Sequence, residues 1–599
     1  MDSFKTRPNT LKKIEACREK KAKVLDLSDP MDDITCLDMQ LPVIPPEVFS
    51  LSHLEELDLR DNIIQVIPEE IKQLKNLKKI NLLGNPLREV ANIKGLFVHY
   101  TDVKKLNIPY ENISGLKLTL SSNRPPKDIF DFPNLTHLDI SLHDFKKPVE
   151  WLSQLTQLTS LDLSFNKLST LEGLEQLSNL TSLDIGCNKL SKLEGLEQLK
   201  NLTSLDLGGN NLAKLKGLEQ LKNLTSLGLG GNNLAKLRGL DQLKNLTSLT
   251  LRNNQLSTLE GLEQLKNLTS LDLRSNQLST LEGLGQLNKL TSLDLGHNKL
   301  STLKGLEQLN NLTSLDFNHN KLSTLEGLDK LKKLTFLNFY YNKLSNSEGA
   351  LSDFNMMNLQ QLHYLTSLNL GANKLSTIKG LEKLSTLTSL NLSRNKLSTV
   401  ENLVHLSQLT SLELGGNLIS TLKSVEKLSQ LTALDLGGNL LSTLKGLENL
   451  SQLTSLDLSY GQLSTLEGLE QLNNLVFLEL SYNKLTTLEG LGQLPKLTAL
   501  SISDNQLLTL KGIEQLSSLL FLELSYNQLS TVEGLEKLSN LYSLNLMNNQ
   551  LSTVDGLEKL TNLSFLGLGH NKLLSLKSLE KLKASPSLDL HNLHHQGIR

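Results

Sequence analysis

A unit of 22 residues recurs along most of the chain, and its short fixed period limits the folds open to it. Residues 201–222 read NLTSLDLGGNNLAKLKGLEQLK, and residues 223–244 read NLTSLGLGGNNLAKLRGLDQLK. A unit this short cannot bury its own apolar side chains, so neighbouring units must stack and share one core. We therefore expect the 599 residues to form a stack of repeats and not several globular domains.

The unit from Leu158 to Asn179 shows how the pattern assigns structure, and its 22 positions are numbered here from that leucine. Leu161 and Leu163 alternate with polar residues, which predicts a short strand with both leucines facing inward. The return segment LEGLEQL has leucines three residues apart, which suits a 3₁₀ turn or a short helix. At position 9, Asn166 is expected to bond backbone groups of a tight bend that would otherwise stay unpaired.

This pattern resembles that of leucine-rich repeat proteins. The 22-residue units are similar to those of the protein phosphatase 1 regulatory subunit and of bacterial internalins. Residues 41–87, with a spacing of 23 between Asn62 and Asn85, resemble the repeats of bacterial Roco-type proteins. The resemblance implies an α/β solenoid: a curved right-handed horseshoe or arc of about 22 to 24 repeats, with a parallel concave sheet and a convex side of 3₁₀ or short helices.

The regularity of the repeats varies along the chain. Gly461 stands where the ladder of position-9 asparagines requires an amide, which predicts a local weak point. The insertion with Phe354, Met356 and Met357 is either a lengthened helix packed on the convex side or a partner contact. We expect six segments: a capping helix in 1–23 with Thr10 as N-cap, irregular repeats in 24–157, regular repeats in 158–344, the insertion in 345–362, regular repeats in 363–579 and a degenerate tail in 580–599.

Composition and motifs exclude several functional classes. The net charge of -2 gives no nucleic-acid footprint, and no apolar run is long enough for a membrane span. Cys17, Cys36 and Cys187 are too scattered for disulfide-bonded caps, and the N-terminus lacks a signal peptide, so we expect a cytoplasmic monomer. No nucleotide-binding loop or hydrolase motif occurs, and we expect neither enzymatic activity nor a cofactor or bound metal. His297 and His319 are the best acid–base or metal candidates.

Positions 3, 5, 7 and 8 of each unit are expected to face the concave side. Position 3 is mostly serine, position 5 is mostly acidic, and we expect the acids to form a solvated strip. Exposed aromatic residues on such columns are not needed by the fold and are typical of interface anchors. Packing of these rings on one another is the alternative. The candidate partner-binding residues are Phe477, Glu479, Tyr482, Phe521, Glu523, Tyr526 and Phe565 in a first patch and Phe336, Tyr340 and Tyr341 in a second.

The sequence thus predicts a non-catalytic scaffold that binds another protein on its concave face. The alternative is a regulatory subunit or sensor region of a signalling enzyme, of the phosphatase-regulator kind or as the repeat part of a Roco-type GTPase. The nearly identical units of 201–244 are expected to act as a spacer.

Overall fold

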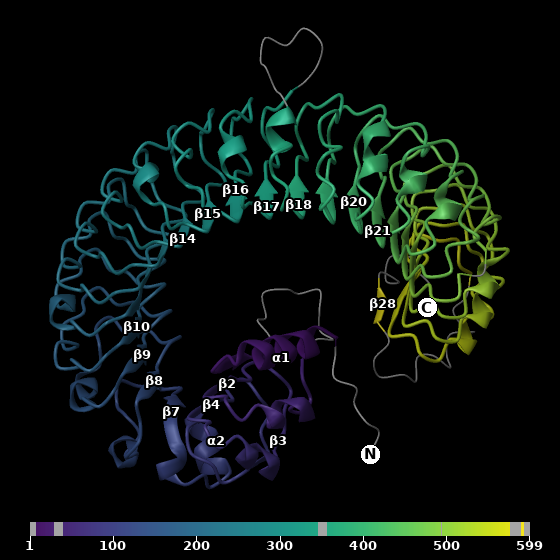
Figure 1. The fold of residues 1–599 in the computed structure, drawn as a ribbon. Coiled ribbons are helices and arrows are strands. Elements are labelled where there is room, and N and C mark those ends of the chain that lie inside the picture. Colours follow the sequence, from purple (N-terminus) through teal and green to yellow (C-terminus); the bar gives the residue numbers. More distant parts are fainter. Residues whose placement is uncertain (1–7, 29–39, 346–355, 493, 575–588, 592–599) are drawn as a thin grey trace. The chain divides into compact units, whose positions relative to one another are not determined.

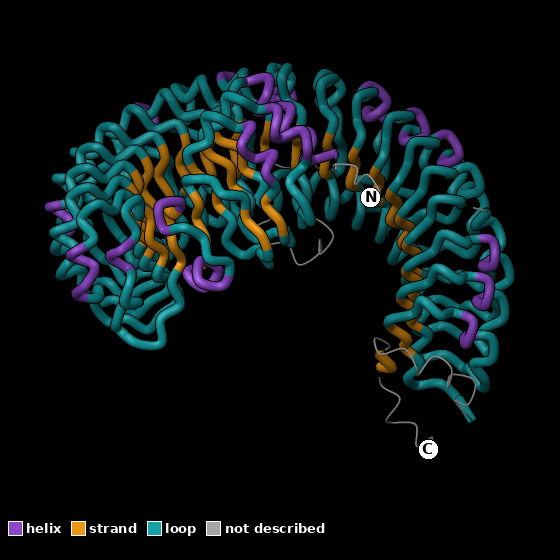
Figure 2. Tube along the Cα trace, turned by 90° about the horizontal axis from the view of Figure 1, so that it is seen from below, coloured by secondary structure: helices purple, strands orange, loops and turns teal. Residues whose placement is uncertain are grey.

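The computed structural model describes residues 8–28, 40–345, 356–492, 494–574 and 589–591. The chain divides into two compact units, Met1–Asn276 and Gln277–Arg599. Within each unit the strands line the inner side and the short helices lie on the outer side (Figures 1 and 2). Among the described residues, no helix has the length and apolar character that crossing a lipid bilayer requires.

Unit 1 holds a parallel sheet in which each strand pairs with the next one along the chain. Its described strands are β1 (Val24–Asp26), β2 (Glu56–Asp58), β4 (Lys79–Asn81), β6 (Leu96–His99), β7 (Ile113–Lys117), β8 (His137–Asp139), β9 (Ser160–Asp162), β10 (Ser182–Asp184), β11 (Ser204–Asp206), β12 (Ser226–Gly228), β13 (Ser248–Thr250) and β14 (Ser270–Asp272). A separate pair is formed by β3 (Val66–Ile67) and β5 (Glu89–Val90).

Unit 2 continues the same pattern with one three-residue strand in each repeat. Its described strands are β15 (Ser292–Asp294), β16 (Ser314–Asp316), β17 (Phe336–Asn338), β18 (Ser367–Asn369), β19 (Ser389–Asn391), β20 (Ser411–Glu413), β21 (Ala433–Asp435), β22 (Ser455–Asp457), β23 (Phe477–Glu479), β24 (Ala499–Ser501), β25 (Phe521–Glu523), β26 (Ser543–Asn545), β27 (Phe565–Gly567) and β28 (Asp589–His591). The strands β9 to β27 correspond to the 19 regular repeats that the sequence pattern defines.

Short 3₁₀ helices lie on the convex side in many repeats, as the leucine spacing predicts, whereas the return segment is a turn in others, such as residues 171–177. The α-helices are α1 (Pro8–Lys20) and α2 (Tyr100–Lys105). The 3₁₀ helices are η1 (Pro46–Ser50), η2 (Glu69–Gln73), η3 (Tyr110–Asn112), η4 (Ile129–Asp131), η5 (Glu150–Gln154), η6 (Leu196–Gln198), η7 (Leu284–Gln286), η8 (Leu328–Lys330), η9 (Met356–Leu359), η10 (Glu401–His405), η11 (Val425–Lys427), η12 (Leu447–Asn449), η13 (Ile513–Gln515), η14 (Leu535–Lys537) and η15 (Leu557–Lys559).

The core follows directly from the strand pattern. In β10, Leu183 is buried while Ser182 and Asp184 on either side are partly exposed. Leucines of the return segments are buried in the same way, so apolar side chains from both sides of each coil fill the interior. The continuous leucine core is the main favourable contribution to the stability of each unit.

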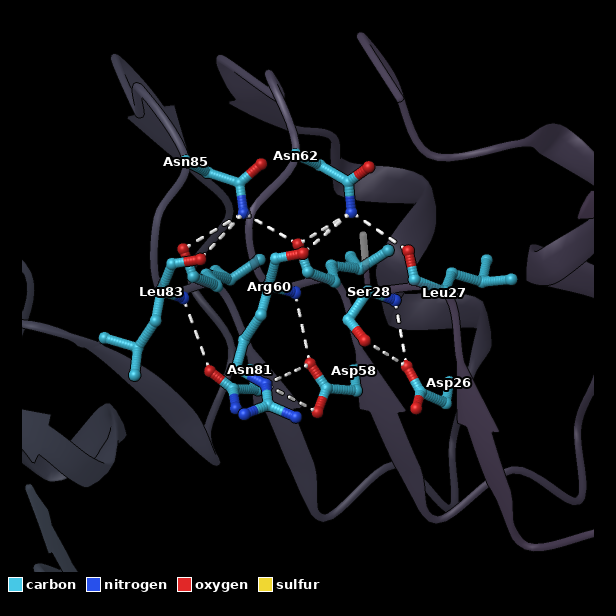
Figure 3. A network of polar contacts seen from close by, with 11 residues as sticks. Asp26, Leu27, Ser28, Asp58, Arg60, Asn62, Asn81, Leu83 and Asn85 are labelled. Carbon is cyan, nitrogen blue, oxygen red and sulfur yellow. Dashed lines mark hydrogen bonds and ion pairs between the residues drawn. The ribbon is translucent and has the colours of Figure 1, made fainter. Parts of the chain in front are cut away.

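A ladder of asparagines ties each repeat to the preceding one. Figure 3 shows the first two rungs, where the Nδ2 group of Asn62 donates to the carbonyls of Leu27, Leu59 and Arg60. The Oδ1 atom of Asn62 accepts the backbone N–H of Leu41 at 2.7 Å. The same four bonds recur in the regular repeats, for example at Asn395. These side chains are buried and satisfy the turn, as the sequence predicts.

The rung at Gly461 is missing, in agreement with the predicted weak point. In the ladder, Asn439 accepts the backbone N–H of Ile419, and Asn483 accepts the backbone N–H of Leu463. By the same pattern, an asparagine at position 461 would accept the backbone N–H of Leu441. Within the described part of the chain, the Leu441 N–H has no acceptor, although this residue is only 3% exposed. An unpaired buried N–H costs about 1–3 kcal/mol.

His143 replaces the asparagine in one irregular repeat and keeps the ladder intact. Its Nε2 atom lies 2.7 Å from the backbone nitrogen of Leu120 and accepts that N–H. Its Nδ1 atom lies 3.1 Å from the carbonyl oxygen of Ile140. The two contacts together require the neutral ring with its proton on Nδ1. An imidazole therefore performs both functions of the missing amide.

The capping helix and the insertion differ in detail from the prediction. Helix α1 begins at Pro8, so the expectation that Thr10 is the N-cap is wrong; proline suits the first turn because its missing N–H has no helical partner there. In the insertion, Met356 and Leu359 in η9 are buried, which favours packing on the convex side for this part. Phe354 and the side chain of Met357 lie outside the described residues, as does Cys36.

Candidate functional site

The phenylalanines of the first predicted patch form a row along the sheet of unit 2. Strand pairing places the position-3 residues of β23 to β27 directly beside one another, in the order Phe477, Ala499, Phe521, Ser543 and Phe565. Phe477 is 41% exposed and Phe521 is 48% exposed, whereas Phe565 is half-buried. The row therefore alternates large rings with small side chains.

Three apolar residues at position 2 extend this row, and the sequence pattern did not identify them. In most repeats position 2 is threonine, whose hydroxyl donates to the carbonyl of the preceding threonine, as Thr454 does to Thr432. From the sequence, only positions 3, 5, 7 and 8 were expected to face the concave side, and position 2 was not considered. The signal was the loss of threonine in a few repeats. The residues that replace it are exposed and apolar: Val476, Leu520 and Tyr542.

The tyrosines of the first patch form a separate row at the other end of the strands. Tyr482 and Tyr526 are about half exposed and stand at position 8, five residues after the phenylalanine of their own repeat. Tyr460 of the preceding repeat stacks on Tyr482 with a centroid distance of 4.3 Å. The negative charge of the neighbouring Asp504 raises the pKa of the Tyr482 hydroxyl. The structure thus places the seven predicted residues in two aromatic rows with Glu479 and Glu523 between them.

Position 8 has an unusual backbone conformation. Its φ angle lies in the left-handed region, with values of 59° at Tyr482 and 53° at Tyr526. Glycine occupies the same position at Gly416 and Gly438, where this conformation carries no steric penalty. For residues with a side chain, the left-handed region costs about 1–2 kcal/mol. The tyrosines are therefore present against the local preference of the backbone.

The second predicted patch is part of a ring stack. Phe336 and Tyr340 are half-buried and Tyr341 is 59% exposed. Tyr341 stacks on His319 with a centroid distance of 4.7 Å, and His319 stacks on His297 at 4.1 Å. Burial lowers the pKa of His319, so its ring favours the neutral form. Lateral packing, the alternative for these aromatic residues, therefore accounts for much of this patch.

Stacking also bears on the proposed acid–base or metal role of the two histidines. Parallel rings direct their nitrogens outward in their own planes and not toward a common point. Among the described residues, no group of three or more His, Cys, Asp or Glu side chains could hold a metal ion.

The acidic column at position 5 has a structural function that the sequence did not reveal. Asp184 accepts the backbone N–H of Gly186 at 2.8 Å, and Glu479 and Glu523 accept the corresponding N–H groups of their own repeats. Burial, reinforced by the charges of Asp162 and Asp206, raises the pKa of Asp184 to about 6. Burial likewise raises the pKa of Asp435 to about 6. The expectation of a solvated strip is thus wrong for these half-buried carboxylates.

Asp184→Asn should stabilise unit 1 at pH 8 and have little effect at pH 4. The pKa of Asp184 is about 6 in the folded state and 3.8 in the unfolded state. The contribution of Asp184 to the free energy of unfolding is therefore most favourable below about pH 4, where the carboxyl is protonated, and this contribution is lost as the pH rises through 6. Asparagine keeps the bond, because Asn369 accepts the Gly371 N–H in the same way. Thermal unfolding from pH 4 to 8 tests this, with the exposed Asp241→Asn as the charge-matched control; equal shifts at both pH values would contradict it.

A shallow hollow of about 690 Å³ lies on the sheet face of unit 1. Its floor is formed by glycines at positions 7 and 8, among them Gly208 and Gly230, because these repeats lack side chains there. Asp206 and Arg252 stand at its margins. The stretch that the sequence suggested to be a spacer therefore contributes glycines to a hollow on this face.

Family comparisons identify the repeat itself. The model described as "Leucine Rich repeats (2 copies)" matches residues 156–198, 200–242, 222–264, 244–286, 266–308, 288–330 and 517–559. Two further leucine-rich repeat models match residues 39–87 and residues 379–400 and 493–517. The matches together cover just over half of the sequence.

The chain belongs to the leucine-rich repeat proteins. The matching models describe the repeat, and none of them describes an enzyme. They do not distinguish the phosphatase-regulator, internalin and Roco-type classes. No curated protein sequence matches the chain.

Solved structures of other leucine-rich repeat proteins are similar to this one. The plant peptide hormone receptor RGFR1 in complex with RGF2 is 26% identical over 92% of this chain and 87% of that chain, with a TM-score of 0.51. A leucine-rich repeat protein of Leptospira interrogans is 30% identical over 75% and 99% of the two chains, with a TM-score of 0.46. An internalin of Listeria monocytogenes is 29% identical over 51% and 88%, with a TM-score of 0.48.

Proposed function

We propose that this leucine-rich repeat protein is a non-catalytic interaction protein that holds a protein partner on the concave face of unit 2. The contact residues are those of the first patch, Phe477, Glu479, Tyr482, Phe521, Glu523, Tyr526 and Phe565, extended by Val476, Leu520 and Tyr542. Phe336, Tyr340 and Tyr341 are a second, smaller contact surface. Its cytoplasmic location stays a prediction from the sequence.

The observation that carries this proposal is the pair of exposed aromatic rows. In other repeats of unit 2, position 3 is mostly serine, as at Ser411, and position 8 is glycine in two repeats, at Gly416 and Gly438. Phe521 and Tyr526 replace these residues, remain about half exposed and, for the tyrosine, occupy a left-handed backbone position. Large aromatic side chains that the scaffold does not require are typical of binding hot spots. The peptide hormone receptor RGFR1, solved with its ligand RGF2, supports this class of function.

The test exchanges the aromatic residues for those that the scaffold uses elsewhere. The variant Phe477→Ser, Tyr482→Gly, Phe521→Ser, Tyr526→Gly should keep its thermal stability, because serine and glycine fit these positions in other repeats. Affinity capture from host lysate, quantified by mass spectrometry, should show the partner retained by the intact protein and reduced at least about 100-fold with the variant.

The control is Phe165→Gly, which removes an exposed ring at position 8 of unit 1. This variant should capture the partner as the intact protein does. Equal capture by the four-residue variant would refute the proposed surface.

A further inference from the structure

The repeats that contain β23 and β25 share a run of seven identical residues that begins in each strand. Phe477–Asn483 and Phe521–Asn527 both read FLELSYN, 44 residues apart, and the repeat between them has Ala499, Ser501 and Asp504 at the corresponding surface positions. Each copy presents a phenylalanine, a glutamate and a tyrosine on the concave face. The face therefore contains two identical binding elements, separated by a strand with small side chains.

The spacing of these elements is fixed by the sheet. Adjacent strands lie about 4.8 Å apart, so equivalent atoms of β23 and β25 are separated by about 9.6 Å at the backbone. Phe565 in β27 repeats the aromatic part of the element after the same interval. Ala499 and Ser543 are the small residues between the three rings. The ring of Tyr542 contacts Phe521 edge-on at a centroid distance of 6.1 Å. The inner side of the curved sheet brings side-chain ends slightly closer than the backbone (Figure 1).

The charge of this face is uniformly negative. From β20 to β27, positions 3, 5, 7 and 8 contain no lysine or arginine and carry the carboxylates Glu413, Asp435, Asp457, Glu479, Asp504 and Glu523. Glu479 and Glu523 are half-buried beside the phenylalanines, and each uses Oε1 to accept a backbone N–H. Among the described residues, no lysine or arginine makes an ion pair with either of them. Oε2 of Glu523 also accepts the side-chain N–H of Asn545 at 2.9 Å. An apolar row beside carboxylates that form no ion pair is complementary to a basic segment.

The repeat distance distinguishes between conformations of such a segment. A polyproline II helix has three residues per turn and advances about 9.3 Å per turn, so every third side chain returns to the same face. An extended β-strand presents alternate residues and turns the third residue to the opposite face. Seven residues of an α-helix advance about 10.5 Å. This distance exceeds the separation of β23 and β25 at the backbone, and it exceeds the shorter separation of their side-chain ends by more.

We infer that the concave face of unit 2 binds a proline-rich basic segment of a partner protein in the polyproline II conformation, with arginine or lysine at every third residue. The basic groups pair with Glu479 and Glu523. The rings of the intervening residues pack into the gaps at Ala499 and Ser543 between the phenylalanines. The hydroxyl of Tyr526 donates to a carbonyl of the segment, which has no internal hydrogen bonds in this conformation. This inference rests on the proposed function and specifies the partner.

The test uses fluorescein-labelled synthetic peptides and fluorescence anisotropy with the full-length protein. One peptide repeats Arg-Pro-Pro four times; a second has the same composition with unevenly spaced arginines; a third is an α-helical peptide with lysines seven residues apart. The first peptide should bind at least about tenfold more tightly than either of the others. Equal binding of the first two peptides, or tighter binding of the helical one, would overturn the inference.

Variants locate the binding site. Glu479→Gln with Glu523→Gln keeps both N–H acceptors and removes two charges, and it should weaken binding of the first peptide about tenfold or more. Asp316→Asn with Asp294→Asn removes two charges from the same column in β15 and β16, and it should change the affinity less than about twofold. Equal losses in the two double variants would indicate general charge attraction and overturn the site.

Filling a gap tests the shape of the face without removing a contact. Ala499→Phe places a third ring between Phe477 and Phe521, at a position where the fold already accepts phenylalanine in both neighbouring strands. It should abolish the preference for the evenly spaced peptide, and a retained preference would overturn the inferred fit. If no peptide binds but lysate capture still depends on the aromatic residues, the inferred occupant is wrong and the proposed function stands.

Discussion

Asn439→Ala should lower the stability of unit 2 by about 3 kcal/mol, because it removes four hydrogen bonds at a buried turn. Asn439 is 4% exposed, accepts the backbone N–H of Ile419 and donates to the carbonyls of Leu414, Leu436 and Gly437. Its loss would leave the Ile419 N–H unpaired next to the already unpaired N–H of Leu441. Two consecutive repeats would then lack the asparagine amide that bonds them to the preceding repeat, and strand pairing would remain.

Gly461→Asn is the opposite change and should raise stability by about 1–2 kcal/mol. An added Cβ would lie 2.6 Å from Oδ1 of Asn483, which accepts the Leu463 N–H, so the Asn483 side chain must shift slightly and keep that bond. Hydrogen exchange of the Ile419 and Leu441 amides, combined with chemical denaturation, measures the stability changes in Asn439→Ala and Gly461→Asn. A local measurement is needed because long repeat arrays do not always unfold in one step. Asn540→Ala, which removes an exposed asparagine, is the control. Unchanged exchange at Leu441 in Gly461→Asn would refute this explanation of the weak point.

Ile14→Asp should detach the N-terminal cap and destabilise the first repeats of unit 1 by about 4 kcal/mol. Ile14 is fully buried on the face of α1 that covers β1, with Cys17 beside it on the same face. A carboxylate placed there is removed from water, and the burial of the isoleucine is lost. The buried Leu25 in β1 and Leu27 just after it would become accessible.

Hydrogen exchange should increase in residues 8–28 and in the next repeats, while unit 2 stays unchanged, since repeats stabilise only their neighbours. The exposed Lys12→Asp introduces the same side chain on the solvent face of α1 and should have little effect. An equal change in both variants would show that charge, and not uncapping, is responsible.

The fold could be predicted because its determinants are local and repeated. Leucine spacing defines both the strand, as at Leu183, and the return segment, and the asparagine ladder follows from the need to satisfy a buried turn. The gap at Gly461 was visible for the same reason.

The surface residues were less predictable than the fold. Each strand has only three residues, so the alternation of side chains does not show which way the residues on either side of the strand point. Val476 and Leu520 at position 2 were therefore missed. The left-handed conformation at position 8 was also not predicted, because the alternation of side chains carries no information on φ. Glycine at position 8 in Gly416 and Gly438 was the available signal. The half-burial of Asp184 likewise depends on the neighbouring repeats and not on the repeat that contains it, so the pattern of one repeat did not predict it.

The asparagine ladder also gives the stack a direction. Each amide bonds its own turn and the preceding repeat, as Asn188 does with the carbonyl of Leu163 and the N–H of Leu168. Under a mechanical load applied to the two ends of unit 2, repeats would separate one at a time, each releasing 22 residues, or about 75 Å of chain. The junction before Gly461 has no such amide, so it is where the stack would part first under tension.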